Sequence, residues 1–121
     1  PLTLVLDTSS GSAELDLRDL TITDFELDAG SGRVELYFPD ASSFEGHIDA
    51  GSGSVVIDLP SNVGLRLELD DGSGQFNPGE RLRFVSGDLD DDSLWETEGY
   101  EDAEFRIHLN LDQGSGSVTI E

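Results

Sequence analysis

At positions 49–55 the chain reads Asp49-Ala50-Gly51-Ser52-Gly53-Ser54-Val55, and close copies of this stretch recur along the sequence. The other copies begin at Asp7, Asp28, Asp70 and Asp112, and Asp91 stands where a sixth would begin. The first four copies follow one another at a constant period of 21 positions, and the last copy begins two periods after the fourth. A fixed period of this length is typical of repeat architectures, in which each repeat is one small structural unit.

Apolar and polar residues alternate on both sides of each copy, as in Leu65, Leu67 and Leu69. A period of two indicates a β-strand with one buried face, so each repeat is predicted to be strand, turn, strand. Glu45 and Arg66, one repeat apart on the outward face, are predicted to pair. Two columns are expected to face the core: Leu6, Leu27, Ile48, Leu69 and Leu111, and Ala13, Val34, Val55, Phe76 and Val118.

Two all-β architectures fit such units. In a β-solenoid each repeat is one coil, all coils have the same length, and equivalent residues stack in columns. In an antiparallel β-sandwich each repeat is a hairpin, and the return segments have no reason to keep a constant length. The constant period favours a single-stranded, β-helix-like solenoid with 21-residue rungs, formed by residues 1–121 as one domain. The antiparallel sandwich of hairpins is the alternative.

An aspartate and two glycines recur in the turns. Glycines that flank a serine supply the positive φ angles of a sharp bend, and the preceding aspartate accepts hydrogen bonds from turn amides. In the first copy Ser9 replaces the first glycine and Gly11 is kept. A structural role in turns is therefore predicted for Asp28, Gly30, Gly32, Asp49, Gly51, Gly53, Asp70, Gly72, Gly74, Asp112, Gly114 and Gly116.

Residues 77–104 break the pattern. Asn77-Pro78-Gly79 predicts a turn, and Leu82 and Phe84 then alternate as in an edge strand. The segment keeps the phase of the repeat, so it is either a fifth coil with a degenerate turn or an insertion that folds over the side or end of the stack. In the second case Trp95 and Tyr100 are expected to cover core that would otherwise be exposed.

The net charge is -21, from 16 Asp and 11 Glu against six Arg and no Lys. Such a surface repels phosphate backbones and anionic lipid, so nucleic acid is not an expected partner. A salt-rich habitat, a bound cation or a basic protein partner would each account for the acidity. The chain has no Cys, which excludes disulfides, thiolate metal sites and cysteine nucleophiles.

Acidic side chains offer two candidate cation sites. The six repeated aspartates at positions 7, 28, 49, 70, 91 and 112 are expected to form a ladder along one edge, where turn capping is the simpler role. Asp88, Asp90 and Asp92 have the i, i+2, i+4 spacing with which a calcium loop converges on one hard cation. Ser93 and Gly99 stand where a helix-loop-helix calcium site needs Gly and Glu. The chain is therefore expected to have no cofactor, with calcium as the alternative.

Catalytic residues are not expected. His47 and His108 are predicted to face outward on different columns, so they do not share a metal ion or relay a proton. The serines of the Gly-Ser-Gly turns lack a neighbouring base. Carboxylate pairs are abundant, but a glycosidase holds them in a cleft, which the flat side of a narrow solenoid does not provide. The chain is predicted not to be an enzyme.

Three stretches carry a family resemblance. The repeat unit at 48–60 ends in Leu59-Pro60, the segment at 62–67 reads Asn-Val-Gly-Leu-Arg-Leu, and Trp-x-Thr-x-Gly-Tyr begins at Trp95, followed by acidic residues, Ala and a closing Gly-x-Gly rung. In these residues the sequence resembles the toast-rack and putative-adhesin β-solenoid families of bacterial envelope proteins. It is also similar to the C-terminal domain of LiaF-type cell-envelope stress regulators. The resemblance implies a right-handed β-helix-like domain from a longer protein that other segments tether to the membrane.

The resemblance also implies a role in envelope sensing, scaffolding or protein interaction, with no catalytic residue to carry over. The expected function is a non-enzymatic domain of the bacterial cell envelope, on either side of the membrane, that presents acidic faces to a protein partner or associates with its own copies. The alternative is an adhesin-like module that binds a divalent cation or a polysaccharide through the acidic loop at 88–92, with Trp95 beside it. Membrane contact is expected only through segments outside residues 1–121.

Overall fold

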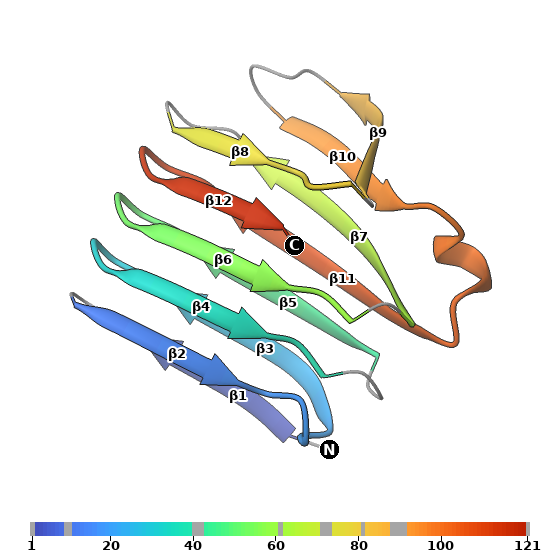
Figure 1. The fold of residues 1–121 in the computed structure, drawn as a ribbon, viewed down its shortest axis with the longest axis horizontal. Helices are drawn as coiled ribbons and strands as arrows, with labels where there is room; N and C mark the ends of the chain where they lie inside the picture. Colours follow the sequence, from blue (N-terminus) through green and yellow to red (C-terminus); the bar gives the residue numbers. More distant parts are fainter. Residues whose placement is uncertain are drawn as a thin grey trace.

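The structure is a computed structural model that describes residues 2–8, 11–39, 43–60, 62–70, 74–80, 82–87 and 92–120. The strands form two sheets, which Figure 1 shows as two layers lying one over the other. Within the described ranges one short 3₁₀ helix, η1 (Tyr100–Asp102), is the only helix. The prediction of an all-β chain is confirmed.

Sheet A has seven strands and sheet B has five. In sheet A the spatial order is β1 (Leu2–Asp7), β3 (Ile22–Asp28), β5 (Phe44–Asp49), β11 (Phe105–Asp112), β7 (Val63–Asp70), β10 (Asp92–Thr97) and β9 (Leu82–Gly87). In sheet B it is β2 (Ser12–Asp16), β4 (Arg33–Tyr37), β6 (Ser54–Asp58), β12 (Ser117–Ile120) and β8 (Gln75–Asn77). The two strands of each repeat therefore lie in different sheets, joined by the glycine turn.

Equivalent strands of neighbouring repeats pair in parallel and in phase. Leu6 lies opposite Leu27, and Leu27 lies opposite Ile48, each one repeat further along the chain. The strands within one repeat belong to different sheets, and equivalent strands of the repeats are paired in parallel. The in-phase pairing carries the two predicted apolar columns into the space between the sheets, where their residues are buried or half-buried in one core.

The stacking order differs from the order of the repeats in the sequence. β11 lies between β5 and β7, and β12 lies between β6 and β8, as Figure 1 shows. The last repeat is thus inserted between the third and the fourth, whereas sequential stacking would place it after the fourth. The phase allows this because Leu111 is three full periods along the chain from its partner Ile48 and two full periods from its partner Leu69.

Within residues 77–104, for which the sequence predicts a degenerate coil or an insertion, β9 and β10 form an antiparallel hairpin. β10 pairs with β7 and β9 pairs with β10, both antiparallel, so sheet A continues beyond β7. Of the two alternatives for residues 77–104, the insertion at the end of the stack agrees with the structure and the degenerate fifth coil is wrong. The Thr97 hydroxyl accepts a hydrogen bond of 3.0 Å from the backbone N–H of Leu65, which ties this hairpin to β7.

Of the two aromatic side chains predicted to cover the core, Trp95 does so and Tyr100 does not. The Trp95 ring packs against Phe76 and Phe84, with centroid distances of 5.4 and 5.5 Å, and so closes the core beside β8. Tyr100 instead lies over Gly64 on the outer side of β7, where a larger residue would meet its ring. This burial raises the pKa of the Tyr100 phenol.

The two glycines of a turn differ in backbone conformation, as the turns at 28–33 and 49–54 show. Gly30 and Gly51 have φ angles of 60° and 59°, the left-handed conformation that favours glycine. Gly32 and Gly53, the second glycines, do not have positive φ; instead, a Cβ on Gly53 would overlap the carbonyl oxygen of Gly32. Close contact between stacked turns therefore explains why the second position is glycine. The prediction of a positive φ at both glycines is wrong for the second one in these turns.

The corner after β2 is held by a charged cluster. The Arg18 guanidinium donates to both carboxylate oxygens of Asp16, at 2.8 and 2.6 Å, and lies 5.0 Å from the centroid of the Tyr37 ring. The hydrogen bonds from Arg18 lower the pKa of Asp16 from 3.8 to about 2. The fold therefore favours the charged form of this carboxylate.

We expect the contribution of Asp16 to stability to disappear in acid. Because the folded-state pKa is lowered, the stabilisation is present above the ordinary pKa and is lost as the pH falls from about 4 to about 2. The difference in Tm between the wild type and an Asp16→Asn variant, followed by circular dichroism, should be constant above about pH 5 and should close towards pH 2. An Arg18→Gln variant removes the same ion pair, so its difference in Tm from the wild type should show the same dependence on pH. A difference that persists at pH 2 would exclude this pair as its cause.

Candidate functional site

The outer face of sheet A carries transverse rows of side chains, because paired residues of neighbouring strands point to the same side of a sheet. The row nearest the glycine turns, called the aspartate row here, is Asp7, Asp28, Asp49, Asp112, Asp70 and Asp92. The second row is Val5, Glu26, His47, Asn110, Glu68, Leu94 and Ser86. The third row is Thr3, Asp24, Glu45, His108, Arg66, Glu96 and Arg83.

The aspartate row corresponds to the predicted ladder, with Asp92 in the place expected for Asp91, which lies outside the described residues. The Asp28 carboxylate accepts a hydrogen bond from the Gly30 amide at 3.2 Å, and Asp49 accepts one from Gly51 at 3.1 Å. These two side chains have the turn-capping role expected from the sequence. In the part of the chain that the structure describes, no group of three His, Cys, Asp or Glu residues is placed to hold a metal ion.

The predicted calcium triplet falls at the tip of the β9–β10 hairpin. Asp88 and Asp90 lie outside the described residues. Asp92 is described: it is the first residue of β10, it is exposed, and it lies opposite Asp70. Its carboxylate therefore belongs to the aspartate row as well as to the acidic loop.

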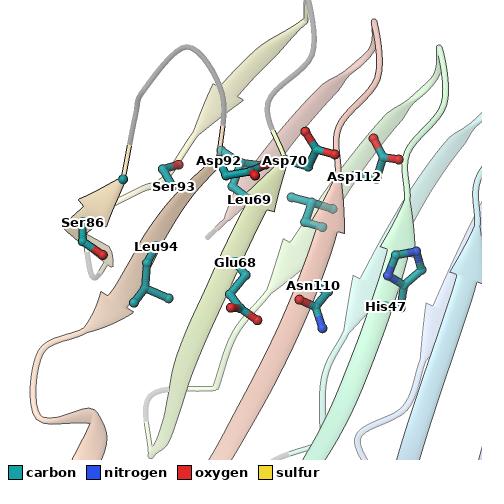
Figure 2. A pocket seen from close by; sticks show the side chains of 12 residues that line it. His47, Glu68, Leu69, Asp70, Ser86, Asp92, Ser93, Leu94, Asn110 and Asp112 are labelled. Atoms are coloured by element: carbon teal, nitrogen blue, oxygen red, sulfur yellow. The ribbon is translucent and has the colours of Figure 1, made fainter.

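A groove of about 550 Å³ crosses the aspartate row and the second row between β5 and β9. Figure 2 shows His47, Asn110 and Glu68 along it, with Asp112, Asp70 and Asp92 nearer the turns. The parallel strands β5, β11 and β7 supply its floor. The hairpin supplies the other side through Asp92, Leu94 and Ser86 from β10 and β9.

The groove is electrostatically negative. Among the described residues that line it, four are carboxylates, namely Glu68, Asp70, Asp92 and Asp112, and none is Arg. The acidity extends to the opposite sheet, where the charge of Glu14 raises the pKa of the Tyr37 phenol. A negative groove of this kind recognises cationic groups through charge-assisted hydrogen bonds.

The positive side chains of this face lie outside the groove, in the third row and at Arg106, one row beyond it. Arg66 pairs with Glu96 at 3.2 Å and Arg83 pairs with Glu98 at 3.0 Å. The predicted pair between Glu45 and Arg66 is wrong, because the inserted β11 places His108 between them. The Nε2 atom of His108 lies 2.7 Å from a Glu68 carboxylate oxygen, so His108 is the one third-row side chain that reaches a groove carboxylate by an identified contact.

The two histidines face outward on different rows, as the strand alternation predicts. His47 lines the groove, and its neighbours in the second row are Glu26 and Asn110. Sequence reasoning did not bring His47, Asn110 and Glu68 together. Asn110 follows His47 by three full periods and Glu68 by two, which is the signal that could have placed them in one row.

The two parallel ladders joined by glycine turns define an all-β repeat protein. Neither protein-family models nor curated protein sequences gave a match. Among solved structures, the chain is similar to a putative cell adhesion protein from Clostridium sporogenes ATCC 15579, with a TM-score of 0.73 and 19% sequence identity. The likeness covers 97% of this chain and 55% of that one, so this chain spans about half the length of its structural neighbour. At this identity the likeness shows the fold, which agrees with the adhesin-like fold that the family resemblance implies.

Across the described ranges, no helix is both long and apolar enough to cross a membrane.

Proposed function

We propose that this chain is a non-enzymatic interaction domain of the bacterial cell envelope that binds a basic protein segment along the groove of sheet A. It is built as a β-solenoid whose last coil is inserted, and it requires no cofactor. The observation that carries the proposal is the groove itself, about 550 Å³ in volume, with four carboxylates among its described lining residues. The fold shared with a putative cell adhesion protein supports an adhesin-like role.

Recognition would depend on several weak contacts acting together. Individual exposed ion pairs contribute about 0.2 to 1 kcal/mol each, so one Lys or Arg side chain would not give a stable complex. Carboxylates on neighbouring strands lie about 4.8 Å apart across the sheet, which presents a regular series of acceptors to a partner with repeated basic residues. The net charge of -21 would also accelerate the encounter with such a partner.

A lysine-rich peptide tests the site. In an NMR titration with an octalysine peptide, we expect the largest amide shifts at His47, Glu68 and Asn110. Glu68→Lys should weaken binding about tenfold, which corresponds to about 1.4 kcal/mol. Glu14→Lys makes the same change in net charge on the outer face of sheet B, and should weaken binding less than about twofold because long-range attraction is screened by salt. Equal losses in both variants would mean that only net charge is recognised.

The cation alternative has support at one end of the same groove, where Asp92 lies opposite Asp70. Calcium bound by the acidic loop would change the surroundings of β10, and Trp95 on this strand would report this through its fluorescence. No change up to about millimolar calcium would leave the basic partner as the better proposal. The Trp95 ring packs against Phe76 and Phe84, on the inner side of sheet A, so a polysaccharide in the groove would be bound without stacking on it.

A further inference from the structure

We infer that the C-terminal repeat, residues 105–120, is exchanged between copies of this chain, so that β11 and β12 of one copy fill the slot between the third and fourth repeats of another. The inference does not depend on what binds in the groove. It follows from the position of this repeat in the stack and from the connection that leads to it.

The slot is an internal one in both sheets. β11 pairs in parallel with β5 from Ile107 to Asp112, and with β7 from Phe105 to Asp112. β12 pairs with β6 on one side and with β8 on the other. Five hydrophobic side chains of the repeat are at most 2% exposed: Ile107, Leu109, Leu111, Val118 and Ile120. Without this repeat, the edges of four strands and a section of the core would be open, and open edges are templates for strand addition.

The repeat is suited to exchange because it follows, along the chain, both of the repeats between which it is inserted, and one connection leads to it from them. Residues 98–104 link it to the β9–β10 hairpin, and within them η1 packs on Gly64 of β7. An identical repeat from another copy would make the same backbone and core contacts, so exchange needs no new interface. The inserted strand also fits its slot by shape, because the Leu109 side chain fills the space next to Gly46, which has no side chain of its own.

Addition at the end of the stack formed by β8 and β9 is a weaker route to self-association. At this end, sheet B finishes in β8, which has only three residues, and the register between β9 and β10 in sheet A is shifted by an irregularity at Leu94 and Trp95. Short and irregular edges are poor templates for pairing. End-to-end addition would also place the aspartate row of one copy beside that of the other. After exchange, each aspartate row would contain the same residues as in a single copy.

Engineered disulfides test the exchange, since the chain has no Cys of its own. His47 and Asn110 are paired neighbours with exposed side chains, and neighbouring strands lie about 4.8 Å apart, within the range that a disulfide spans. His47→Cys and Asn110→Cys variants of different mass are unfolded together, refolded at high concentration and oxidised. We expect a disulfide-linked heterodimer about fivefold more abundant than in a control mixture of His47→Cys with Glu14→Cys, whose exposed site lies on sheet B. High salt should increase the yield by screening the two acidic bodies.

A second pair and a tied chain complete the test. Glu68→Cys with Asn110→Cys probes the other side of the slot and should give the same heterodimer. A chain carrying both His47→Cys and Asn110→Cys, oxidised as a monomer before mixing, holds its own repeat and should form no exchanged dimer on native incubation at high concentration. Circular dichroism checks that each variant is folded. Heterodimer yields no higher than the control for both pairs would overturn the inference, as would exchange by the tied chain.

Discussion

A Gly53→Ala variant is expected to lose about 3 kcal/mol of its free energy of unfolding, although the substitution adds a single methyl group. Gly53 lies in the middle of the stack of turns, between Gly32 and Gly116. Its new Cβ would overlap the Gly32 carbonyl oxygen, and this oxygen accepts a hydrogen bond of 3.0 Å from the Ser54 amide. The obstacle is therefore backbone, which can move only by breaking the ladder between turns. Urea denaturation followed by circular dichroism measures the loss.

Two matched variants separate close contact from other effects of the turn. Ser52→Ala changes the exposed neighbour in the same turn and should alter the stability by no more than about 0.5 kcal/mol. Gly99→Ala places a side chain at a φ of 76° where no atom lies within 4 Å, so it measures the effect of positive φ alone, about 1 to 2 kcal/mol. A loss at Gly53 no larger than the loss at Ser52 would contradict the contact between turns.

The period and the alternation were sufficient to predict the strands, the turns and the inward columns. Leu27, Ile48 and Leu111 are buried where the pattern places them, because each repeat has a two-residue alternation and one core to bury it in. The same information misses the second role of the turn glycines. A sequence shows that glycine recurs, but whether φ or a neighbouring carbonyl requires it depends on how closely the turns stack.

The order of the stack could not be predicted from the period. The last repeat is in phase with its neighbours both when it is inserted between the third and fourth repeats and when it follows the fourth. Residues 105–120 are separated from the third and fourth repeats by whole periods, so both slots align its apolar columns equally well. Shape distinguishes them: Gly46 is a gap in an inward column that otherwise consists of large residues. Leu109 beside it fills the gap, and this complementarity acts only between neighbours in space.

The candidate site depends on that order, which is why sequence reasoning identified its aspartates but did not bring His47, Asn110 and Glu68 together. Asp92 was named as part of an acidic loop, and it does lie on the groove. His47 lies on β5 and Glu68 lies on β7, and both strands flank β11 because β11 is inserted between them. In sequential stacking the two would be direct neighbours, and Asn110 would be absent from between them.

A double-mutant cycle between Gly46 and Leu109 tests the inserted order directly. Leu109→Ala is expected to lower the free energy of unfolding by about 3 kcal/mol, because the side chain is fully buried and its removal leaves a cavity. Gly46→Ala alone should lose about 1 kcal/mol, since its Cβ would lie 2.9 Å from Cδ1 of Leu109. In the double variant the new methyl group enters the space that Leu109 has left. The combined loss should therefore be smaller than the sum by about 1 kcal/mol.

Leu67 provides the matched control, because it occupies the same inward column one strand further on. Leu109 lies between Gly46 and Leu67 in the inserted order, so Gly46→Ala and Leu67→Ala should be additive within about 0.5 kcal/mol. In sequential stacking Gly46 would instead face Leu67, and Leu109 would lie beyond it. If the effect of Gly46→Ala were coupled to that of Leu67→Ala and additive with that of Leu109→Ala, the strands would be stacked in sequential order. The proposed groove and the proposed exchange of the last repeat would then both lose their structural basis. Urea unfolding of the wild type, the three single variants and the two double variants is sufficient to decide between the two orders.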